Sequence, residues 1–401
     1  MIDYSKLMNN RLMSLKPSGI RRFFDIANEM DHVISLSIGE PDFTTPWHVR
    51  QEGIETLRKG HTWYSPNRGF EELRKQICNY YARRFNVEYD PDTEVLVTVG
   101  GSEAIDLCIR AVVETGDEVL IPQPAFVCYE PMTVMAGGTP VIIETKSENG
   151  FRLTAEELKA AITPKTKLLI LPFPNNPTGA VMRREHLEEI AKVLEGTNIL
   201  VLSDEIYGEL TYGKERHVSF ADIGSMKERT IVVSGFSKAY AMTGWRLGYA
   251  LGPEEVISQM LKLHQYAIMS APTTAQYAAI EALKHGDNDI EHMREEYDMR
   301  RRLIVDEFCR MGLTCFEPEG AFYVFPSIQI SGMSSEDFCE KLIYAQRVAI
   351  VPGTAFGDCG EGFARVSYSY SLKHLKVALA RIREFLEDLH HGNQAESAGK
   401  N

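Results

Sequence analysis

A lysine within a run of small and apolar residues is the first candidate for chemistry. Lys238 lies in the segment Ser234–Gly248, which reads SGFSKAYAMTGWRLG. Such surroundings lower the pKa of an amine and make it nucleophilic near neutral pH. Arg246 follows on the same segment, and a guanidinium held there could bind a phosphate through two hydrogen bonds. The segment therefore indicates a lysine nucleophile beside an anion site.

Two turns could bring hydrogen-bond donors to a ligand. Gly100, Gly101 and Ser102 follow the apolar run Val95–Val99 and open a helical pattern. Their backbone N–H groups could approach a phosphate at the helix N-terminus. Asn176 lies in the turn PNNPTG, which could aim its amide at a ligand. Both patterns are also typical of purely structural turns, so neither identifies a site alone.

Two charged residues follow or interrupt apolar runs. Asp204, in the segment DEIY with Tyr207, comes directly after Ile199–Leu202. A carboxylate at such a place needs a cation or a donor, although capping a helix N-terminus is an equal alternative. Arg365 lies in the apolar segment ARVSY and requires an anion, either a structural carboxylate or a ligand. A phosphate cradle, a lysine, a carboxylate, a phenol, an amide and two arginines are together the groups that hold and activate pyridoxal phosphate.

Most of these candidates follow short apolar runs that alternate with helical patterns. Continuous apolar strands separated by helices are typical of a mainly parallel sheet with helices on both faces. Ligands bind beyond the carboxyl ends of such strands, where the candidates lie. We therefore predict an α/β fold, with a capping box from Thr154 to Glu157 opening one of its helices. The predicted strands are Val95–Val99, Glu118–Ile121, Pro140–Glu144, Lys167–Leu171, Ile199–Leu202, Ile231–Val233 and Gly248–Leu251, and the helices include Ser102–Glu114, Thr154–Ile162 and Arg183–Glu195.

The two ends of the chain predict a smaller α+β domain. The final helix carries a stripe of leucine and isoleucine from Leu372 to Leu389, which we interpret as core packing rather than an interaction site. We place the large domain at residues 47–286 and the small domain at residues 1–46 and 287–390. The tail 391–401 lacks an apolar face, and we expect it to be disordered. The other elements predicted there are helices Asp287–Met311 and Glu336–Gln346 and strands Ala321–Phe325, Ala349–Val351 and Ala364–Ser369.

Composition excludes several classes of protein. The chain of 401 residues carries 43 Lys and Arg against 56 Asp and Glu, a net charge of −13, which disfavours binding to nucleic acid. No apolar stretch is long enough to span a membrane, and no secretion signal is evident at the start. The 7 cysteines are scattered without a paired motif, which favours reduced thiols in the cytoplasm over a disulfide scaffold or a zinc module.

Six motifs in order carry a family resemblance. The run Gly235–Gly248 resembles the pyridoxal-phosphate attachment signature of the class I/II (fold-type I) aminotransferases. The segments NNPTG, DEIY and ARVS occur in the order which that family uses, and GEPDF and YSPNRG near the start match it as well. The resemblance covers the chain from Pro17 to Leu389. It implies a pyridoxal-phosphate-dependent aminotransferase.

The resemblance assigns roles around the cofactor ring. Lys238 would bond the aldehyde of pyridoxal phosphate and later carry the substrate proton. Asp204 would pair with the pyridinium nitrogen and keep it protonated. Tyr207 and Asn176 would hydrogen-bond the phenolic oxygen of the ring, and Phe126 would stack on the ring.

The resemblance also implies a phosphate site that two subunits share. Tyr64 resembles the tyrosine that reaches the phosphate of the neighbouring subunit, which makes the expected assembly a homodimer with shared active sites. The other implied phosphate ligands are Arg246, the backbone N–H groups of Gly101 and Ser102, and the hydroxyl of Ser237 or Ser234.

The substrates are less specified than the cofactor. Arg365 would bind the α-carboxylate with help from the backbone of Gly39, and Ile20 matches the mobile segment that closes over the substrate. Some relatives carry a lysine for a second carboxylate where this chain has Ser102. We therefore expect a neutral or aromatic L-amino acid to be preferred over aspartate as donor, with a 2-oxo acid such as 2-oxoglutarate as acceptor.

Three other readings stay open on the sequence. A C–S β-lyase on the same scaffold begins with the same lysine, carboxylate and arginine, so these residues do not separate it from a transaminase. A non-catalytic regulator with a similar domain is disfavoured by the acidic charge. A structural α/β protein would leave Lys238 without a cofactor.

Overall fold

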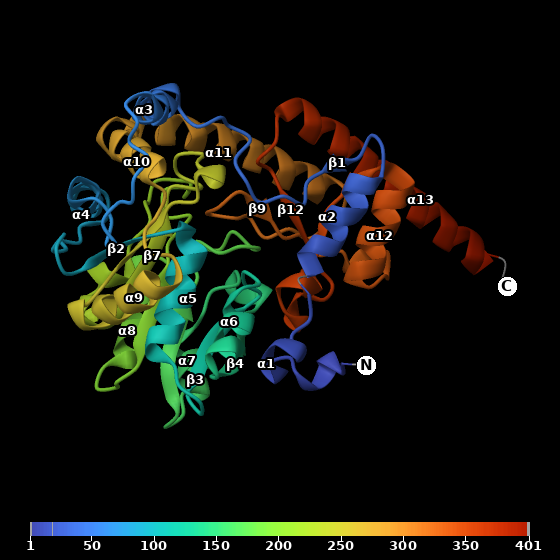
Figure 1. Cartoon of the computed structure of the whole chain (residues 1–401). Coiled ribbons are helices and arrows are strands. Elements are labelled where there is room, and N and C mark those ends of the chain that lie inside the picture. Colours follow the sequence, from blue (N-terminus) through green and yellow to red (C-terminus); the bar gives the residue numbers. More distant parts are fainter. Residues whose placement is uncertain (1, 18, 399–401) are drawn as a thin grey trace.

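The computed structural model describes residues 2–17 and 19–398, and it leaves out the side chains of residues 20–22, 24, 28 and 392–398. The chain forms a sheet with helices on both faces and a second body built from the two ends (Figure 1). The long helix α11 (Asp287–Arg310) runs from the first body to the second. The predicted fold class is confirmed.

A seven-stranded sheet forms the large body, in the order β2-β8-β7-β6-β5-β3-β4. The strand β8 is antiparallel to both of its neighbours, and the other pairs are parallel. The strands β2, β3, β5, β6 and β7 therefore all end at the same edge of the sheet. The bounds are β2 (Val95–Thr98), β3 (Glu118–Gln123), β4 (Thr139–Glu144), β5 (Thr166–Leu171), β6 (Leu200–Asp204), β7 (Thr230–Gly235) and β8 (Gly248–Leu251).

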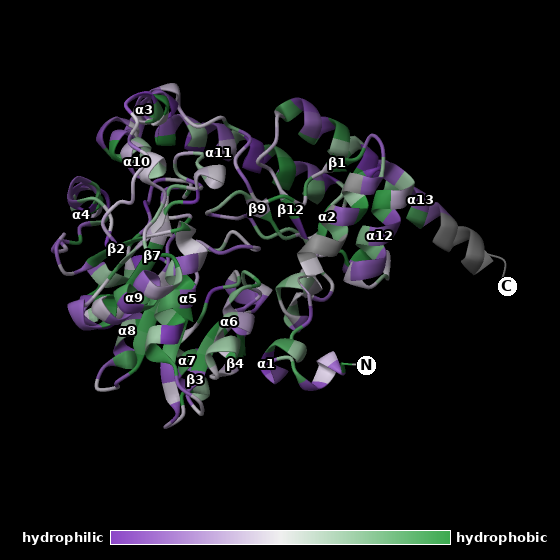
Figure 2. Cartoon of the chain, in the orientation of Figure 1, coloured by the Kyte–Doolittle hydropathy of each residue, from purple (hydrophilic) through white to green (hydrophobic). Residues whose placement is uncertain are grey.

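The apolar strands are continuous because helices cover both faces of the sheet. In β5, Leu168 and Ile170 pack with the cluster that includes α5 and α9, whereas Leu169 and Leu171 pack with the cluster that includes α7 and α8. Alternate side chains of a strand point to opposite faces, so both sets must be apolar. Green apolar strands lie between mixed helices in Figure 2. The covering helices are α3 (Trp47–Arg58), α4 (Glu71–Phe85), α5 (Gly100–Val112), α6 (Tyr129–Ala136), α7 (Ala155–Ala161), α8 (Arg184–Leu194), α9 (Glu254–Ala267) and α10 (Thr273–His285).

Local signals at the helix ends act as the sequence predicts. The hydroxyl of Thr154 accepts from the backbone N–H of Glu157 at 3.2 Å, and the Glu157 carboxylate accepts from the N–H of Thr154 at 3.0 Å. The predicted capping box therefore begins α7. Helix α11 ends before Gly312, whose φ of +82° is left-handed backbone that glycine adopts without strain.

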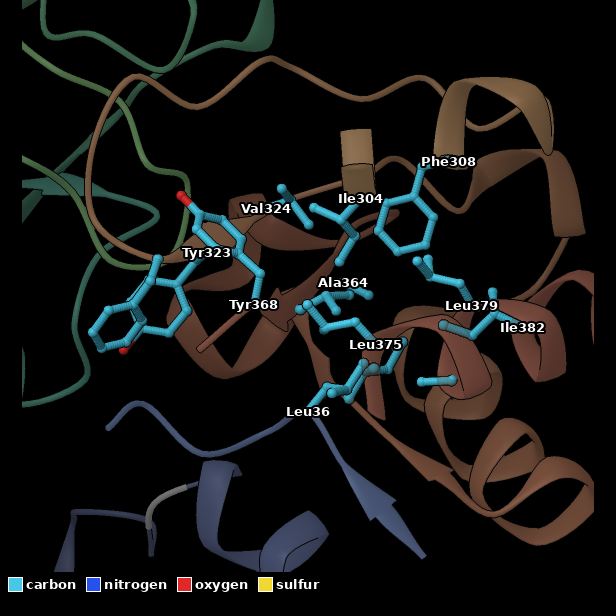
Figure 3. Packing of buried hydrophobic residues seen from close by; sticks show 14 of the residues in the cluster. Leu36, Ile304, Phe308, Tyr323, Val324, Ala364, Tyr368, Leu375, Leu379 and Ile382 are labelled. Carbon is cyan, nitrogen blue, oxygen red and sulfur yellow. The ribbon is translucent and has the colours of Figure 1, made fainter. Parts of the chain in front are cut away.

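The second body joins both ends of the chain. Strand β1 (Ile34–Ser35) pairs in parallel with β10 (Val348–Ala349). Leu36 packs in one cluster with Phe308 and Leu379, and Tyr323 and Tyr368 lie at the opposite end of this cluster from Ile382 (Figure 3). The predicted domain boundaries stay a prediction. The remaining elements include α1 (Asn10–Met13), α2 (Gly19–Glu29), α12 (Ser335–Gln346), α13 (Leu372–Ala398), and an antiparallel sheet in the order β11 (Val351–Pro352), β12 (Ala364–Ser367), β9 (Tyr323–Val324).

The last helix confirms one prediction and corrects another. Leu375, Leu379, Ile382 and Leu386 of its stripe are buried in the cluster, so the stripe is core packing. The expectation of a disordered tail from residue 391 is wrong as far as Ala398, because α13 continues to that residue. Extending an existing helix costs far less than starting one, and the tail contains good helix formers.

None of the helices within residues 2–17 and 19–398 combines the length and apolar character needed to cross a bilayer.

Candidate active site

A cavity of about 690 Å³ lies at the carboxyl edge of the sheet. Its walls come from the segments that follow β2, β3, β5, β6 and β7, together with the loop after β1 and residues of β9 and β12. The strand ends meet there because these strands run in one direction. The predicted site residues that line it are Gly39, Gly101, Ser102, Phe126, Asn176, Asp204, Tyr207, Ser237, Lys238, Arg246 and Arg365.

Lys238 presents its amine to this cavity. It lies just beyond β7, and its Nζ donates to the carbonyl of Gly39 at 2.6 Å. Burial, together with the charge of Arg365, lowers the pKa of Lys238 to about 8, although the charge of Glu40 acts in the opposite direction. An amine with such a pKa is available as a nucleophile and as a proton carrier near neutral pH.

Asp204 ends β6 and is only 6% exposed. The hydroxyl of Tyr129 donates to its Oδ2 at 2.7 Å, and the backbone N–H of Ile206 donates to its Oδ1 at 3.2 Å. Burial raises the pKa of Asp204 to about 6, against the effect of these two bonds. The alternative of a helix cap is wrong, because the next helical segment in the described chain after β6 begins at Phe220. Among the described residues, no arginine or lysine is hydrogen-bonded to this carboxylate, and Lys238 lowers its pKa only through its charge, so the carboxylate fits a cationic ligand.

Arg365 is a buried cation held by neutral groups. Its guanidinium donates to Oδ1 of Asn176 at 3.0 Å and to the carbonyl of Ser37, and it lies 4.5 Å from the ring centroid of Tyr323 and 4.8 Å from that of Phe356. Burial lowers its pKa. No carboxylate in the described part of the chain forms an ion pair with it, and its Nε has no hydrogen-bond partner there. A buried cation in this state requires an anion from outside the chain.

The turn after β5 divides its two roles between neighbouring asparagines. Asn175 holds the turn, because its Oδ1 accepts from the N–H of Thr178 at 3.1 Å and from the Thr178 hydroxyl at 2.8 Å. Asn176 lines the cavity and contacts Arg365. The reading as a rigid turn therefore holds for Asn175, whereas a ligand contact of Asn176 stays a prediction.

The start of α5 and Arg246 lie close together in an arrangement that could hold an anion. Gly100 has a φ of +77°, and a Cβ there would lie 2.7 Å from Nη2 of Arg246. A Cβ at Gly248 would lie 2.5 Å from the carbonyl carbon of Gly100. Glycine at both positions lets β8 and the arginine approach the N-terminus of α5. The N–H groups of Gly101 and Ser102 lie at that helix end, whose dipole favours an anion.

Three predicted residues need separate comment. Ser237 lines the cavity, whereas the hydroxyl of Ser234 donates to the carbonyl of Glu205 at 3.4 Å, so the structure favours Ser237 of the two. Tyr64 does not line the cavity and is 78% exposed. Ile20 belongs to α2, and its side chain lies outside the described residues.

Sequence reasoning missed two tyrosines of the site. Tyr129 holds Asp204, and the hydroxyl of Tyr323 lies 2.8 Å from that of Tyr207. Neither belongs to a spaced motif. The available signal was weak: a tyrosine in an apolar segment carries a hydroxyl that needs a partner once buried.

Comparison with known proteins decides the family. The model of the family described as "Aminotransferase class I and II" matches residues 31–382 of this chain. The chain belongs to this family. This aminotransferase is 50% identical over 379 residues to YugH of Bacillus subtilis (strain 168), a provisionally assigned aminotransferase, covering 94% of this chain and 98% of that protein.

Two further relatives carry assigned substrates. The aspartate aminotransferase of Pyrococcus abyssi (strain GE5 / Orsay) is 45% identical over 383 residues, covering 95% of this chain and 98% of that protein. The crystal structure of the aromatic aminotransferase from Pyrococcus horikoshii OT3 shares 44% identity at a TM-score of 0.87, covering 91% of this chain and 99% of that one.

The comparisons confirm the predicted family and show that the protein is a transaminase. They contradict the readings as a non-catalytic regulator and as a purely structural protein, and the relatives named here give a C–S β-lyase no support. The family depends on pyridoxal phosphate and acts on amino acids and 2-oxo acids.

Proposed function

We propose that this aminotransferase binds pyridoxal phosphate in the cavity and moves the amino group of a neutral or aromatic L-amino acid to a 2-oxo acid. One observation carries the proposal. The amine of Lys238, the carboxylate of Asp204 and the unpaired guanidinium of Arg365 all line a single cavity. A lysine, an acid and an anion site are the groups which that cofactor and an amino acid require.

The residues present fit the cofactor. Asp204 would hold the pyridinium nitrogen, and the cation would restore the ionised form that burial disfavours. Bound pyridoxal phosphate supplies an electron sink for the charge left at the substrate Cα. The phosphate would be held by Arg246, Gly101, Ser102 and Ser237, with Phe126 on the ring and Tyr207 and Asn176 at its oxygen.

The chain itself orients the substrate and moves the proton. Arg365 would bind the α-carboxylate, and Asn176 fixes the plane of its guanidinium. Lys238, with its pKa near 8, would accept a proton from the substrate Cα and donate it to C4′ of the cofactor. The carbonyl of Gly39 keeps Nζ directed along the cavity wall.

The preference for a donor without a second carboxylate rests on the charges available. The cations of the described residues that line the cavity are Lys238, Arg246 and Arg365. Each already has a role toward the cofactor or the α-carboxylate, so none is left for a distal carboxylate. A distal carboxylate would therefore be buried without a cation, which costs free energy, and a donor with a neutral or aromatic side chain avoids that cost.

Steady-state measurements test the substrate class. With 2-oxoglutarate as acceptor, kcat/KM for phenylalanine or alanine should exceed that for aspartate. A tenfold preference for aspartate would reject the substrate class while leaving the transaminase intact. Product analysis with a cysteine conjugate separates the lyase, since elimination yields pyruvate and ammonia instead of a 2-oxo acid from the intact donor.

Absorption spectroscopy tests the cofactor site. Adding pyridoxal phosphate to the protein should produce a visible absorbance band. Lys238→Ala should lose both the band and turnover, whereas Lys262→Ala, which removes a lysine on the surface of α9, should keep both. Retention of band and turnover in Lys238→Ala would reject the assigned nucleophile.

We further propose a homodimer whose sites are shared. Trp63, Tyr64 and Tyr266 are exposed, the last to 94%, and the segments that carry them are joined by hydrogen bonds between residues 63–67 and residues 265–273. A second copy would cover this apolar surface and receive Tyr64 at its phosphate site.

The free cysteines fit the predicted cytoplasmic location.

Complementation between variants tests the shared site. Lys238→Ala and Tyr64→Ala homodimers should each be impaired, and a mixed dimer should regain one intact site, with the lysine of one chain and the tyrosine of the other. Absence of recovery in a mixed dimer verified by mass would show that Tyr64 does not serve the partner.

A further inference from the structure

Tyr323 occupies a position in the cavity wall that the proposed roles do not use. It lies on β9, is only 1% exposed, and lines the cavity. Its hydroxyl oxygen lies 2.8 Å from that of Tyr207. Figure 3 shows Tyr323 at the end of the apolar cluster away from Ile382. Its hydroxyl therefore points out of the core of the second body and toward Tyr207.

Neighbours fix this hydroxyl from two further sides. A Cβ at Gly39 would lie 2.1 Å from the Tyr323 oxygen, so the hydroxyl packs directly against that glycine. The guanidinium of Arg365 lies 4.5 Å from the centroid of the Tyr323 ring. Tyr323 thus has little freedom to turn away from Tyr207, and its ring lies beside a buried cation.

The pair has a preferred direction of donation. Each phenol has one hydrogen, so a Tyr207 that donates into the cavity must accept from Tyr323. Burial raises the pKa of both hydroxyls and the Arg365 charge lowers both, so each keeps its proton and can donate it. When Tyr207 donates into the cavity, the proton of Tyr323 goes to Tyr207, and a chain of two hydroxyls in one direction strengthens the second bond.

We propose that Tyr323 is a positioning residue: its hydroxyl donates to Tyr207 and so keeps the proton of Tyr207 directed at the ligand in the cavity. This inference rests on the proposed function, in which the acceptor is the ring oxygen of pyridoxal phosphate. Tyr323 then determines how well Tyr207 stabilises the charge on that oxygen.

A double-mutant cycle on the reconstituted holoenzyme tests the inference. The pH midpoint of the visible absorbance of the bound cofactor is measured in the wild type, Tyr207→Phe, Tyr323→Phe and the double variant. Losing the Tyr207 donor should raise the midpoint, because the charge on the ring oxygen is less stabilised. Tyr323→Phe should raise it by roughly half to one pH unit, the size of one hydrogen bond. The double variant should shift no further than Tyr207→Phe, since Tyr323 acts only through Tyr207.

Tyr368→Phe is the matched control. Tyr368 is a buried tyrosine of the same cluster, and its hydroxyl donates to the carbonyl of Ala321 at 3.1 Å, so its loss should leave the midpoint unchanged. An unchanged midpoint in Tyr323→Phe, or additive shifts in the double variant, would overturn the inference. Loss of the band in Tyr323→Phe but not in Tyr207→Phe would also overturn it, because Tyr323 would then act on structure. Absence of a band in the wild type would instead reject the proposed cofactor.

Discussion

Replacing Asp204 by asparagine is expected to stabilise the cofactor-free protein while damaging its activity. The carboxylate is buried with two hydrogen bonds, and no lysine or arginine of the described residues is hydrogen-bonded to it. An asparagine of the same shape can accept from the N–H of Ile206 and donate to the oxygen of Tyr129. The substitution thus removes the buried charge and leaves the local packing in place.

The size of the effect follows from the pKa. Burial raises the pKa of Asp204 from 3.8 to about 6 in the folded protein. The folded form therefore holds a proton that the unfolded chain releases, and stability falls as pH rises from near 4 to near 6. By linkage, this cost reaches between about 1 and 2 kcal/mol at about pH 5 and about 3 kcal/mol at about pH 7.5. Asparagine carries no such cost, so its advantage should grow across this range.

Urea unfolding of the cofactor-free protein measures this difference. The free energy of unfolding is compared at several pH values and one protein concentration, since assembly also contributes to stability. Asp306→Asn on the exposed face of α11 is the control, because its ion pair with Arg310 lies in solvent and should add little at any pH. With pyridoxal phosphate bound, the wild type should become the more stable of the two proteins, since the pyridinium cation then pairs with Asp204. A difference between Asp204→Asn and wild type that stays constant from about pH 5 to about pH 7.5 would refute the reasoning.

Two other predictions concern a histidine and a glycine. Burial favours the neutral form of His48, but its hydrogen bonds to Asp289 at 3.0 Å and Glu281 at 2.9 Å outweigh this and raise its pKa. The stabilisation by these bonds is complete below the ordinary pKa of 6.5 and is lost as pH rises through the raised pKa of His48. The midpoint temperature of thermal unfolding should therefore fall over this pH range in the wild type, and His48→Gln should lack this fall. Gly100→Ala should weaken pyridoxal-phosphate binding by roughly tenfold or more, as measured by titrating the visible band, because its Cβ meets Arg246 in backbone strained for alanine. Unchanged affinity would show that the cradle does not hold the phosphate.

Much of the fold was predictable because its signals are local. The run Lys167–Leu171 is apolar on both faces, and the structure buries it between two layers of helices. The Thr154 capping box needs only residues three apart, and it forms as expected. The tail after residue 390 was misjudged because helix propagation depends on the helix before it, which composition alone does not report.

The amino-acid sequence by itself determined which side chains follow which strands, and hence that Lys238 and Asp204 lie at one edge of the sheet, whereas the packing of the second body brings Arg365 of β12 to them. Only the tertiary structure decided their partners: Tyr129 on Asp204, Tyr323 on Tyr207, and neutral groups alone around Arg365. The physical reason is the separation along the sequence over which each interaction acts. The positions of strands and helix starts follow from neighbours in the chain, whereas a hydrogen bond between residues 75 or 116 positions apart follows from packing of the whole molecule.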